Sequence, residues 1–541
     1  MRSIGSFDYI IVGAGTAGCV LANRLSADPD VSVLLLEAGG KDDWIWIHIP
    51  VGYLYCINNP RTDWCYQTGP EPGLNGRAIR YPRGRVLGGS SSINAMLYLR
   101  GQARDYDEWA QLTGDSGWAW QNVLPVFMKV EDHWRGADEK HGQGGEWRVE
   151  PVKLRWDVLE SFRAAANESG IAWTDDFNRG DNSGVSRYEV NQKGGVRWNA
   201  SKAFLRPAMQ RPNLTVLTGA LTKKLRLAGR RVDGVEFFRQ EGNMSEEVFA
   251  GARRETILAA GAIGSPQILQ LSGIGPGTLL QRHGISVAHE LPVGENLQDH
   301  LQLRMVFKVK NALTLNTMLD SWWTKAKMGL EYALFRGGPM TMAPSQLGAF
   351  AKSDPALATP DLQYHVQPIS LDRFGDPPHQ FPAFTASVCN LRPTARGHVR
   401  ITSPDPRAYP AITPNYLSTE EDRKTAVASL RLTRRIVAGT EAMKKHEPEE
   451  FMPGPAFQSD EELLEAAGNV GTTIFHPVGT CRMGRENDSA AVVDPKFRVR
   501  GIERLRVIDA SIMPTITSGN TNSPTVMIAE RASAIVLGDK A

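Results

Sequence analysis

The segment Gly13-Ala14-Gly15-Thr16-Ala17-Gly18, near the amino terminus, decides the fold because its glycines have the spacing G-x-G-x-x-G. The apolar run 7–12 before it predicts a buried strand, and apolar positions between 17 and 25 share one face of a predicted helix. A second apolar run, 31–36, predicts another strand, which closes at Glu37. Strand, glycine turn, helix, strand and acid, in this order, predict a dinucleotide-binding unit rather than an ordinary glycine turn.

The chemistry of this unit follows from its small residues and its one acid. Without bulky side chains in the way, backbone N–H groups at the start of a helix can approach a pyrophosphate closely. A carboxylate at the end of the second strand, here Glu37, accepts hydrogen bonds from a ribose diol. FAD and NAD both bind in this manner, so the unit alone leaves the choice between them open.

The overall charge favours a small substrate. The chain has 541 residues, roughly three domain lengths, and its 61 Lys and Arg nearly balance 59 Asp and Glu, for a net charge of +2. No basic stripe or surplus marks a nucleic-acid surface, so we predict no nucleic-acid partner. Hydrophobic residues at 41% predict a globular protein with a real core.

The cysteines and the hydropathy bear on the compartment. Five cysteines without a CxxC pair or a Cys/His cluster predict neither a disulfide framework nor a metal site: Cys19, Cys56, Cys65, Cys389 and Cys481. We therefore expect a reduced, cytoplasmic location and, because the strand 7–12 starts so early, no signal peptide. No run reaches the ~18 apolar residues of a membrane span; loose attachment to the inner face of a membrane stays open.

After the first forty residues the strand–helix–strand pattern breaks off. A middle section rich in Trp, Pro and Gly leads to alternating runs at 361–366 and 398–402, which predict an antiparallel sheet with one face covered. We predict a discontinuous nucleotide-binding domain at 1–155, 205–310 and 465–541, and a substrate domain at 156–204 and 311–464. Within the latter, four aromatic residues suit helix packing as well as a pocket lining: Trp322, Trp323, Tyr332 and Phe335.

Five further segments together resemble the glucose–methanol–choline (GMC) oxidoreductase family. They are GRVLGGSSSIN (84–94), GAIGSPQILQLSGIG (261–275), GENLQDH (294–300), FHPVGT (475–480) and NTNSPT (520–525). Taken alone, the first could be a surface turn, and the run 256–261 would suit a core as well as a cofactor. In order along the chain, from residue 13 to residue 531, the matches cover essentially its whole length.

The resemblance implies FAD and an α/β fold. We expect a doubly wound Rossmann-type FAD-binding domain with an inserted substrate domain, built on an antiparallel sheet flanked by helices. The FAD contacts that the resemblance implies are Gly13, Gly15, Thr16, Ala17, Gly18, Glu37, Ala38, Val86, Gly89, Ser90, Asn94, Ala95, Met96, Leu97, Thr222, Asp509, Ala510 and Thr521. Relatives with covalently bound flavin carry a His just before the Asn of the first signature. Ile93 stands there in this chain, so we expect non-covalent FAD.

His476 and Asn520 form the candidate catalytic pair. Unaided, a lone His before a proline is more often structural, and an Asn beside Thr521 and Asn522 more often forms a turn. In the family that this chain resembles, the general-base histidine and a second His or Asn occupy these two places. Alcohol oxidation needs such a pair, because a base must take the hydroxyl proton while a hydride leaves the adjoining carbon.

The expected activity is FAD-dependent oxidation of a neutral, primary alcohol to an aldehyde or ketone, by an enzyme acting on CH–OH donors. The electron acceptor is a quinone of the respiratory chain or O2, so an alcohol oxidase of the same family is an alternative. A lyase, a photodecarboxylase or a non-catalytic flavin protein on the same fold are others. The sequence leaves the oligomeric state open.

One position argues against choline as the substrate. Choline-oxidising relatives carry a Glu two positions after the His of the Asn-Leu-Gln-Asp-His segment, where its carboxylate can face a quaternary ammonium. In this chain that position is Gln302. Because an amide has no charge, we expect uncharged alcohols to be preferred.

Overall fold

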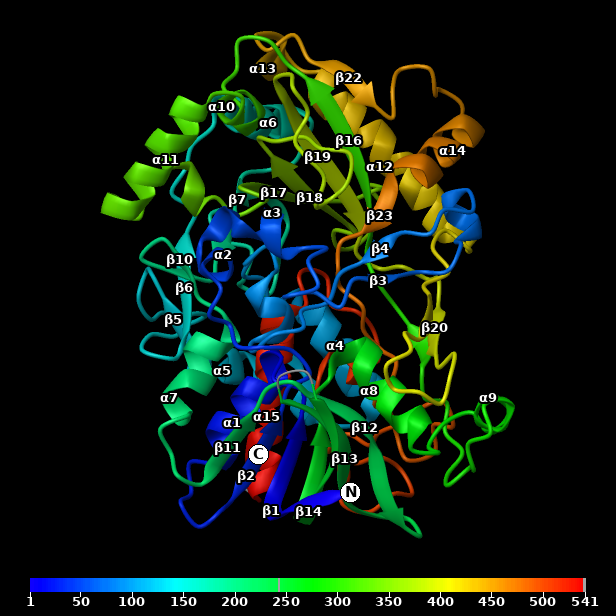
Figure 1. The fold of residues 1–541 in the computed structure, drawn as a ribbon. Coiled ribbons are helices and arrows are strands. Elements are labelled where there is room, and N and C mark those ends of the chain that lie inside the picture. Colours follow the sequence, from blue (N-terminus) through cyan, green and yellow to red (C-terminus); the bar gives the residue numbers. More distant parts are fainter. Residues whose placement is uncertain (242–243, 539–541) are drawn as a thin grey trace.

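The computed structural model describes residues 1–241 and 244–538. Residues 242–243 and 539–541, which the predicted nucleotide-binding domain includes, lie outside the described residues. Two seven-stranded sheets dominate the fold, one in each half of the molecule (Figure 1). The α/β architecture predicted from the sequence is confirmed.

The first sheet is a mixed sheet with a parallel core. Its order is β11-β2-β1-β14-β13-β12, with β24 beside β14. β1 pairs in parallel with β2 and β14, β2 with β11, and β14 with β24. The strands span Arg2–Val12 (β1), Val33–Leu36 (β2), Leu214–Leu217 (β11), Ala220–Ala228 (β12), Arg231–Glu241 (β13), Met244–Leu258 (β14) and Leu505–Val507 (β24). The predicted strand 31–36 therefore begins two residues later than expected.

The glycine segment connects β1 to helix α1 (Thr16–Leu25) as predicted. Gly13 has a φ of +100°, and a Cβ there would lie 2.6 Å from the carbonyl oxygen of Ala259. A Cβ on Gly18 would lie 1.9 Å from the carbonyl oxygen of Gly13. Only glycine at both positions lets the turn close and the helix pack against the strand.

The carboxyl-terminal helix α15 (Asn522–Leu537) packs against α1. Thr16 Oγ1 donates to Asn522 Oδ1 over 2.7 Å, which joins the first turns of the two helices. The two ends of the chain thus build one layer on the same sheet (Figure 1).

The second sheet is antiparallel. Its order is β22-β16-β19-β18-β17-β7, with β23 also paired to β16. The strands span Gly184–Arg187 (β7), Leu301–Lys308 (β16), Leu347–Ala351 (β17), Leu362–Gln367 (β18), Ala383–Asn390 (β19), Glu449–Met452 (β22) and Gly471–Thr473 (β23). Helices α6 (Asp157–Glu168), α12 (Glu420–Ala438) and α14 (Asp460–Val470) contact its strands, which confirms an antiparallel sheet flanked by helices.

Two details of this sheet differ from the prediction. All six residues of β18 are buried, so the sheet is covered on both faces there and not on one. The predicted strand at 398–402 corresponds to β20 (Gly397–Arg400), which pairs in a separate three-stranded sheet with β15 (Glu295–Leu297) and β21 (Ala411–Thr413). Alternation of polar and apolar residues cannot show whether the polar face of a strand meets solvent or a buried cavity. On β18 the polar residues face the cavity that is described below.

The predicted domain boundaries remain a proposal. Strand β16 lies within the range 205–310 and β23 within 465–541, and both pair in the antiparallel sheet. Among the described residues, none of the helices combines the length and the apolar character that crossing a bilayer requires.

Candidate active site

A cavity lies between the two sheets and receives residues from both. At its lower end it reaches the carboxyl ends of β1, β2, β14 and β24, through Gly13, Glu37, Ala259 and Asp509. Ligands of open α/β sheets bind in this crevice, where the strand order reverses. At its upper end the cavity meets β16 and β18, through Gln302 and His365.

Most of the predicted site residues line this cavity. They are Gly13, Gly15, Thr16, Ala17, Glu37, Ala38, Gly89, Ser90, Asn94, Ala95, Met96, Leu97, Thr222, His476, Asp509, Ala510, Asn520 and Thr521. Gly18 does not line it, because it packs α1 against the glycine turn. Val86 does not line it either; its side chain is buried with Ile47, Cys56 and Ile93.

The lower end of the cavity fits a long ligand with a polar, hydroxyl-bearing end. The Glu37 carboxylate accepts hydrogen bonds from the backbone N–H groups of Ala14 (2.9 Å) and Gly39 (2.7 Å), and burial raises its pKa to about 7. Its remaining lone pairs can accept from a ribose diol. Thr222 Oγ1 is buried and has no hydrogen-bond partner among the described residues, so it can bond to a ligand. These observations match an adenosine end of FAD.

Beside them, Asp509 fixes the turn that follows β24. Its carboxylate accepts from the backbone N–H groups of Gly261 (2.8 Å) and Ser511 (2.8 Å) and from Ser265 Oγ (2.6 Å). Burial raises the pKa of this carboxyl. The carboxylate thereby holds the start of α8 (Gly261–Leu271) against the carboxyl ends of β14 and β24.

The segment from Asn94 to Leu97 forms one wall of the cavity and is held from behind. Met96 has a φ of +63°, unusual for a residue with a side chain. Asn94 Oδ1 accepts from the Met96 backbone N–H (2.9 Å) and from Arg197 Nη1 (2.9 Å), and the Met96 carbonyl accepts from Asn191 N–H (2.7 Å). The strained backbone is therefore secured on both sides.

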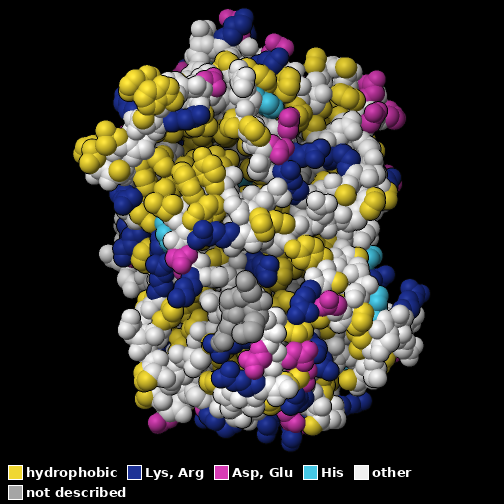
Figure 2. Space-filling model, in the orientation of Figure 1, with side chains coloured by type: hydrophobic (Ala, Val, Ile, Leu, Met, Phe, Trp, Pro, Cys, Tyr) yellow, Lys and Arg dark blue, Asp and Glu magenta, His cyan; other side chains and the backbone are white. Residues whose placement is uncertain are grey.

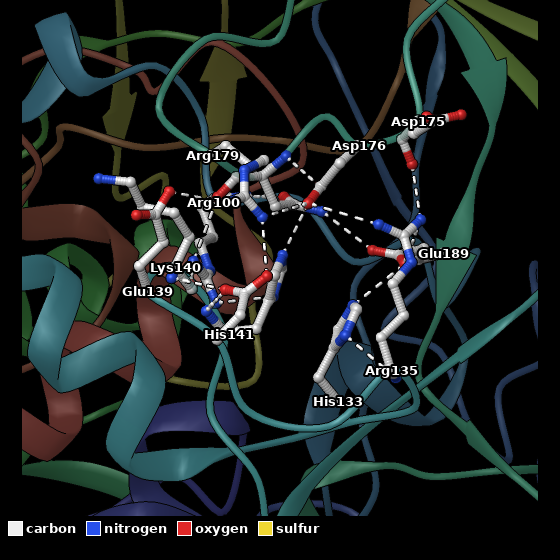
Figure 3. A network of polar contacts seen from close by, with 12 residues as sticks. Arg100, His133, Arg135, Glu139, Lys140, His141, Asp175, Asp176, Arg179 and Glu189 are labelled. Atoms are coloured by element: carbon white, nitrogen blue, oxygen red, sulfur yellow. Dashed lines mark hydrogen bonds and ion pairs between the residues drawn. The ribbon is translucent and has the colours of Figure 1, made fainter.

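A buried ionic network (Figure 3) includes Arg100, three residues along the chain from this wall. Arg100 Nη2 lies 2.7 Å from Glu131 Oε1, and both side chains are fully buried. His141 joins Glu131 (3.2 Å) to Asp176 (2.7 Å), and these two carboxylates raise its pKa to about 9 against the effect of burial. The network ties β5 (Glu131–His133) to the chain around residue 100 and so supports the cavity wall.

His476 lines the upper end of the cavity, on a loop fixed by Asp299. The Asp299 carboxylate accepts from the backbone N–H of His476 (2.8 Å) and from Tyr81, Tyr416 and Thr473 hydroxyls. It is fully enclosed, and burial raises its pKa. Asp299 belongs to the Asn-Leu-Gln-Asp-His segment, so that segment and the His476 segment meet at this carboxylate.

A chain of hydrogen bonds sets the tautomer of His476. His300 Nε2 lies 3.1 Å from the Leu391 carbonyl, which can only accept, so this nitrogen carries the proton. In the neutral ring His300 Nδ1 is then an acceptor, and it takes its hydrogen bond from His476 Nδ1, 3.1 Å away. The unprotonated nitrogen of His476 is therefore Nε2.

Asn520 completes this chain at the cavity surface. Its Nδ2 lies 3.0 Å from His476 Nε2 and donates to it, and its Oδ1 accepts from Gln363 Nε2 over 3.3 Å. The structure thus brings together the two residues that the sequence places 44 positions apart. The Nε2 atom of His476 and the amide N–H of Asn520 therefore face each other in the wall of the cavity.

Burial keeps these imidazoles uncharged. The pKa of His476 is lowered well below 6.5, first by burial and then by His300, His365 and Arg83. Burial also lowers the pKa of His300 to about 4 and that of His365 to about 3. At neutral pH His476 is a neutral ring whose Nε2 carries no proton and accepts the hydrogen bond from Asn520, which is the form a general base requires.

The sequence analysis missed three residues that surround His476. His365 and Gln363 alternate on β18, His365 lines the cavity, and Gln363 bonds to Asn520. Polar residues spaced by two along this strand, Gln363, His365 and Gln367, were the available signal. Arg83 also lines the cavity and donates to the Phe475 carbonyl over 2.6 Å. Arg83 stands just before the segment 84–94, and nothing in the sequence around it indicates a role in the site.

The four aromatic residues weighed as pocket or packing residues do not line the cavity. Tyr332 is buried in helix α11 (Trp322–Phe335) and packs as a core residue. Trp322, Trp323 and Phe335 are 63%, 70% and 75% exposed, so neither alternative holds for them.

Comparison with known proteins agrees with this arrangement. The sequence profiles of the GMC oxidoreductase family match residues 7–302 and 393–529. The chain is 42% identical over 534 residues to the alcohol dehydrogenase (acceptor) of Pseudomonas putida, covering 98% of this chain and 96% of that protein. It is 41% identical over 543 residues to an oxygen-dependent choline dehydrogenase of Photobacterium profundum, covering 99% and 93%.

A solved structure, pyridoxine 4-oxidase from Mesorbium loti, has a TM-score of 0.88 and 32% sequence identity, and the match covers 99% of this chain and 100% of that one. Profiles, relatives and fold agree over nearly the full length. The chain therefore belongs to the GMC oxidoreductase family and is an oxidoreductase that acts on CH–OH donors.

Proposed function

We propose that this enzyme oxidises a neutral primary alcohol to an aldehyde, with non-covalently bound FAD and with His476 as the general base. The observation that carries the proposal is the hydrogen-bond chain from Leu391 to Asn520, which leaves the Nε2 lone pair of His476 at the cavity surface. FAD, when bound here, supplies the acceptor for the hydride that leaves the alcohol carbon.

The residues of the chain divide the remaining work. His476 Nε2 takes the hydroxyl proton, which it can do at neutral pH because burial keeps the ring uncharged. Asn520 Nδ2, which bonds to Nε2 in the described structure, can turn its N–H to the alcohol oxygen and hold it beside the base. His300 acts as a positioning residue, since its Nδ1 keeps the proton of His476 on the far side of the ring.

The electron acceptor is part of the proposal. The P. putida relative is named for an unspecified acceptor and the P. profundum relative for oxygen. We propose a quinone-type acceptor, with O2 as the competing candidate. Parallel assays with an artificial quinone and with O2 would separate a dehydrogenase from an oxidase.

Anaerobic reduction of the bound flavin by a panel of alcohols tests the activity itself. Wild-type enzyme should lose its yellow absorbance with its substrate, whereas His476→Ala should keep its flavin and be reduced ~10²–10⁴-fold more slowly. His446→Ala is the matched control, because His446 is also buried but lies away from the cavity. Flavin that no alcohol reduces would favour a lyase or a photodecarboxylase on this fold.

A further inference from the structure

Helix α11 has apolar residues on the side that faces away from the protein. The helix contacts the rest of the chain through Met328 and Tyr332, which are one turn apart and buried. Tyr332 Oη donates to the Gly195 carbonyl over 3.1 Å. The opposite side of the helix, at spacings of three, four and seven residues, carries Trp322, Trp323, Ala326, Leu330, Ala333 and Leu334.

These outward side chains are largely uncovered. Trp322 and Trp323 are 63% and 70% exposed, and Leu330 and Leu334 are 60% and 64% exposed. The two indole rings stack on each other with centroids 3.9 Å apart instead of packing on the protein. A surface helix ordinarily turns such residues inward, so an outward apolar face of this extent indicates a binding surface.

The apolar surface continues beyond the helix. Figure 2 shows hydrophobic side chains gathered over α11 and on the neighbouring surface toward α2 (Ile45–His48) and α3 (Tyr53–Cys56). Leu313, just before α10 (Leu315–Leu319), is 61% exposed, and Ile45 in α2 is 61% exposed. The surface is therefore a broad face rather than a single side chain.

Basic residues border this face. Lys325, Lys327 and Arg336 are all exposed, and none of them forms an ion pair with a carboxylate in the part of the chain that the structure describes. A helix with Trp and Leu on one face and cations along its edges has the pattern of helices that lie in the interface of an anionic bilayer. The lysine ammonium groups can reach the headgroups while the apolar side chains enter the acyl boundary.

The shape also favours a lipid surface over a protein partner. Helix α11 projects from the edge of the molecule as a convex ridge (Figure 1). A stable protein interface needs about 800 Å² of complementary surface on each partner. A ridge bordered by exposed cations offers a protein partner little such surface, whereas a bilayer adapts to it.

We propose that the outward face of α11 inserts into the interface of a membrane rich in anionic phospholipid and attaches the enzyme there as a peripheral protein. No part of this proposal depends on the substrate or on the catalytic residues. It predicts that attachment can be removed without loss of the oxidoreductase reaction.

Co-sedimentation of the holoenzyme with vesicles tests the proposal. Wild-type protein should sediment with phosphatidylglycerol–phosphatidylcholine vesicles and much less with pure phosphatidylcholine. The triple variant Trp322→Ser, Trp323→Ser, Leu330→Ser should lose at least about tenfold in partition coefficient while its flavin reduction is unchanged. The double variant Lys325→Ser, Lys327→Ser should lose the preference for the anionic vesicles. Trp134→Ser with Trp173→Ser is the matched control, because these exposed indoles lie outside α11.

A second measurement needs no variant. Brominated phospholipid in the vesicles should quench part of the wild-type tryptophan fluorescence, since Trp322 and Trp323 would lie at the acyl boundary. Absence of both sedimentation and quenching would overturn the proposal, as would a triple variant that binds vesicles like the wild type. If the wild-type protein does not bind vesicles but forms dimers, and the triple variant does not form them, the outward face of α11 binds a second copy of the chain instead.

Discussion

The Nδ1 atoms of His300 and His476 lie 3.1 Å apart, at the junction of two ring planes inclined by 85°. Only one of the two nitrogens can carry a proton in a neutral pair. Because His300 Nε2 is committed to the Leu391 carbonyl, the shared proton belongs to His476. His300 does not line the cavity, yet it determines which nitrogen of His476 faces the substrate.

Replacement of His300 should slow the reaction without affecting the cofactor. In His300→Leu the acceptor for His476 Nδ1–H is lost, so the base can adopt the wrong tautomer. Flavin content should stay at one per chain, and flavin reduction should slow by less than the ~10²–10⁴-fold of losing the base. His300→Asn, whose carbonyl oxygen can accept, should recover part of the rate. If His300→Leu and the wild type reduce their flavin at equal rates, His300 is not needed to set the tautomer of His476.

The pH dependence of kcat/KM should reflect the lowered pKa of His476. A base is inactive below its pKa, so a lowered pKa extends activity to more acidic solution. The acid-side fall in kcat/KM should lie below pH 6.5, the ordinary value for histidine. His365→Asn removes one neighbour that disfavours protonation, so the fall should move to higher pH. A profile falling near pH 6.5 in both proteins would contradict this.

Choline should be a poor substrate. Among the described residues that line the cavity, the only carboxylates are Glu37 and Asp509, both at its lower end. Gln302 lines the upper end; its Nε2 donates to the Thr473 carbonyl, and its Oε1 is buried with no hydrogen-bond partner in the part of the chain that the structure describes. A carboxylate at ~4 Å from a cation contributes on the order of 4 kcal/mol at an effective dielectric of ~20, before desolvation. Even half of that exceeds tenfold in affinity.

The matching variant is Gln302→Glu. It should raise the kcat/KM of choline and lower that of neutral alcohols, measured side by side. Wild-type turnover of choline as efficient as that of the best neutral alcohol would refute the prediction.

FAD should be released intact on denaturation. The position before Asn94 holds Ile93, whose side chain is 3% exposed, lines the cavity and has no nucleophilic atom. After precipitation with acid, all of the yellow colour should appear in the supernatant and run as FAD on chromatography. Colour that stays with the pelleted protein would indicate a covalent bond from another residue.

The network behind the cavity wall should make stability depend on alkaline pH. The pKa of His141 is raised from 6.5 to about 9 in the folded protein, so its contribution is complete below pH 6.5 and is lost as the pH rises through about 9. The Tm of wild type should fall across this window. In His141→Leu the same slope should be absent, and unfolding at pH 6 should be easier by about 3 kcal/mol, as for other broken buried ion pairs. His379→Leu is the control, because this half-buried histidine pairs with a carboxylate that is itself exposed, Asp372.

The glycine unit was predictable because its requirements are local. A strand, a turn without side chains and an acid follow one another within forty residues, and the structure confirms the order. The pairing of His476 with Asn520 came only from the resemblance, since nothing in either segment shows that they meet. The role of His300 and the Gln363–Asn520 contact depend on strands β16 and β18 meeting the His476 loop. Such contacts arise from tertiary packing, which no spacing along the chain encodes.

The contact between Thr16 and Asn522 joins residues 506 positions apart, and β24 completes the parallel core from the same late part of the chain. During synthesis on the ribosome, at roughly 5–20 residues per second, the early strands must wait for about 25–100 s before these partners emerge. Until then β14 lacks its parallel neighbour β24, and α1 lacks the helix that packs on it. The nascent enzyme therefore cannot form its complete cofactor site during translation, and we expect it to depend on chaperones until the last turn of α15 has left the ribosome.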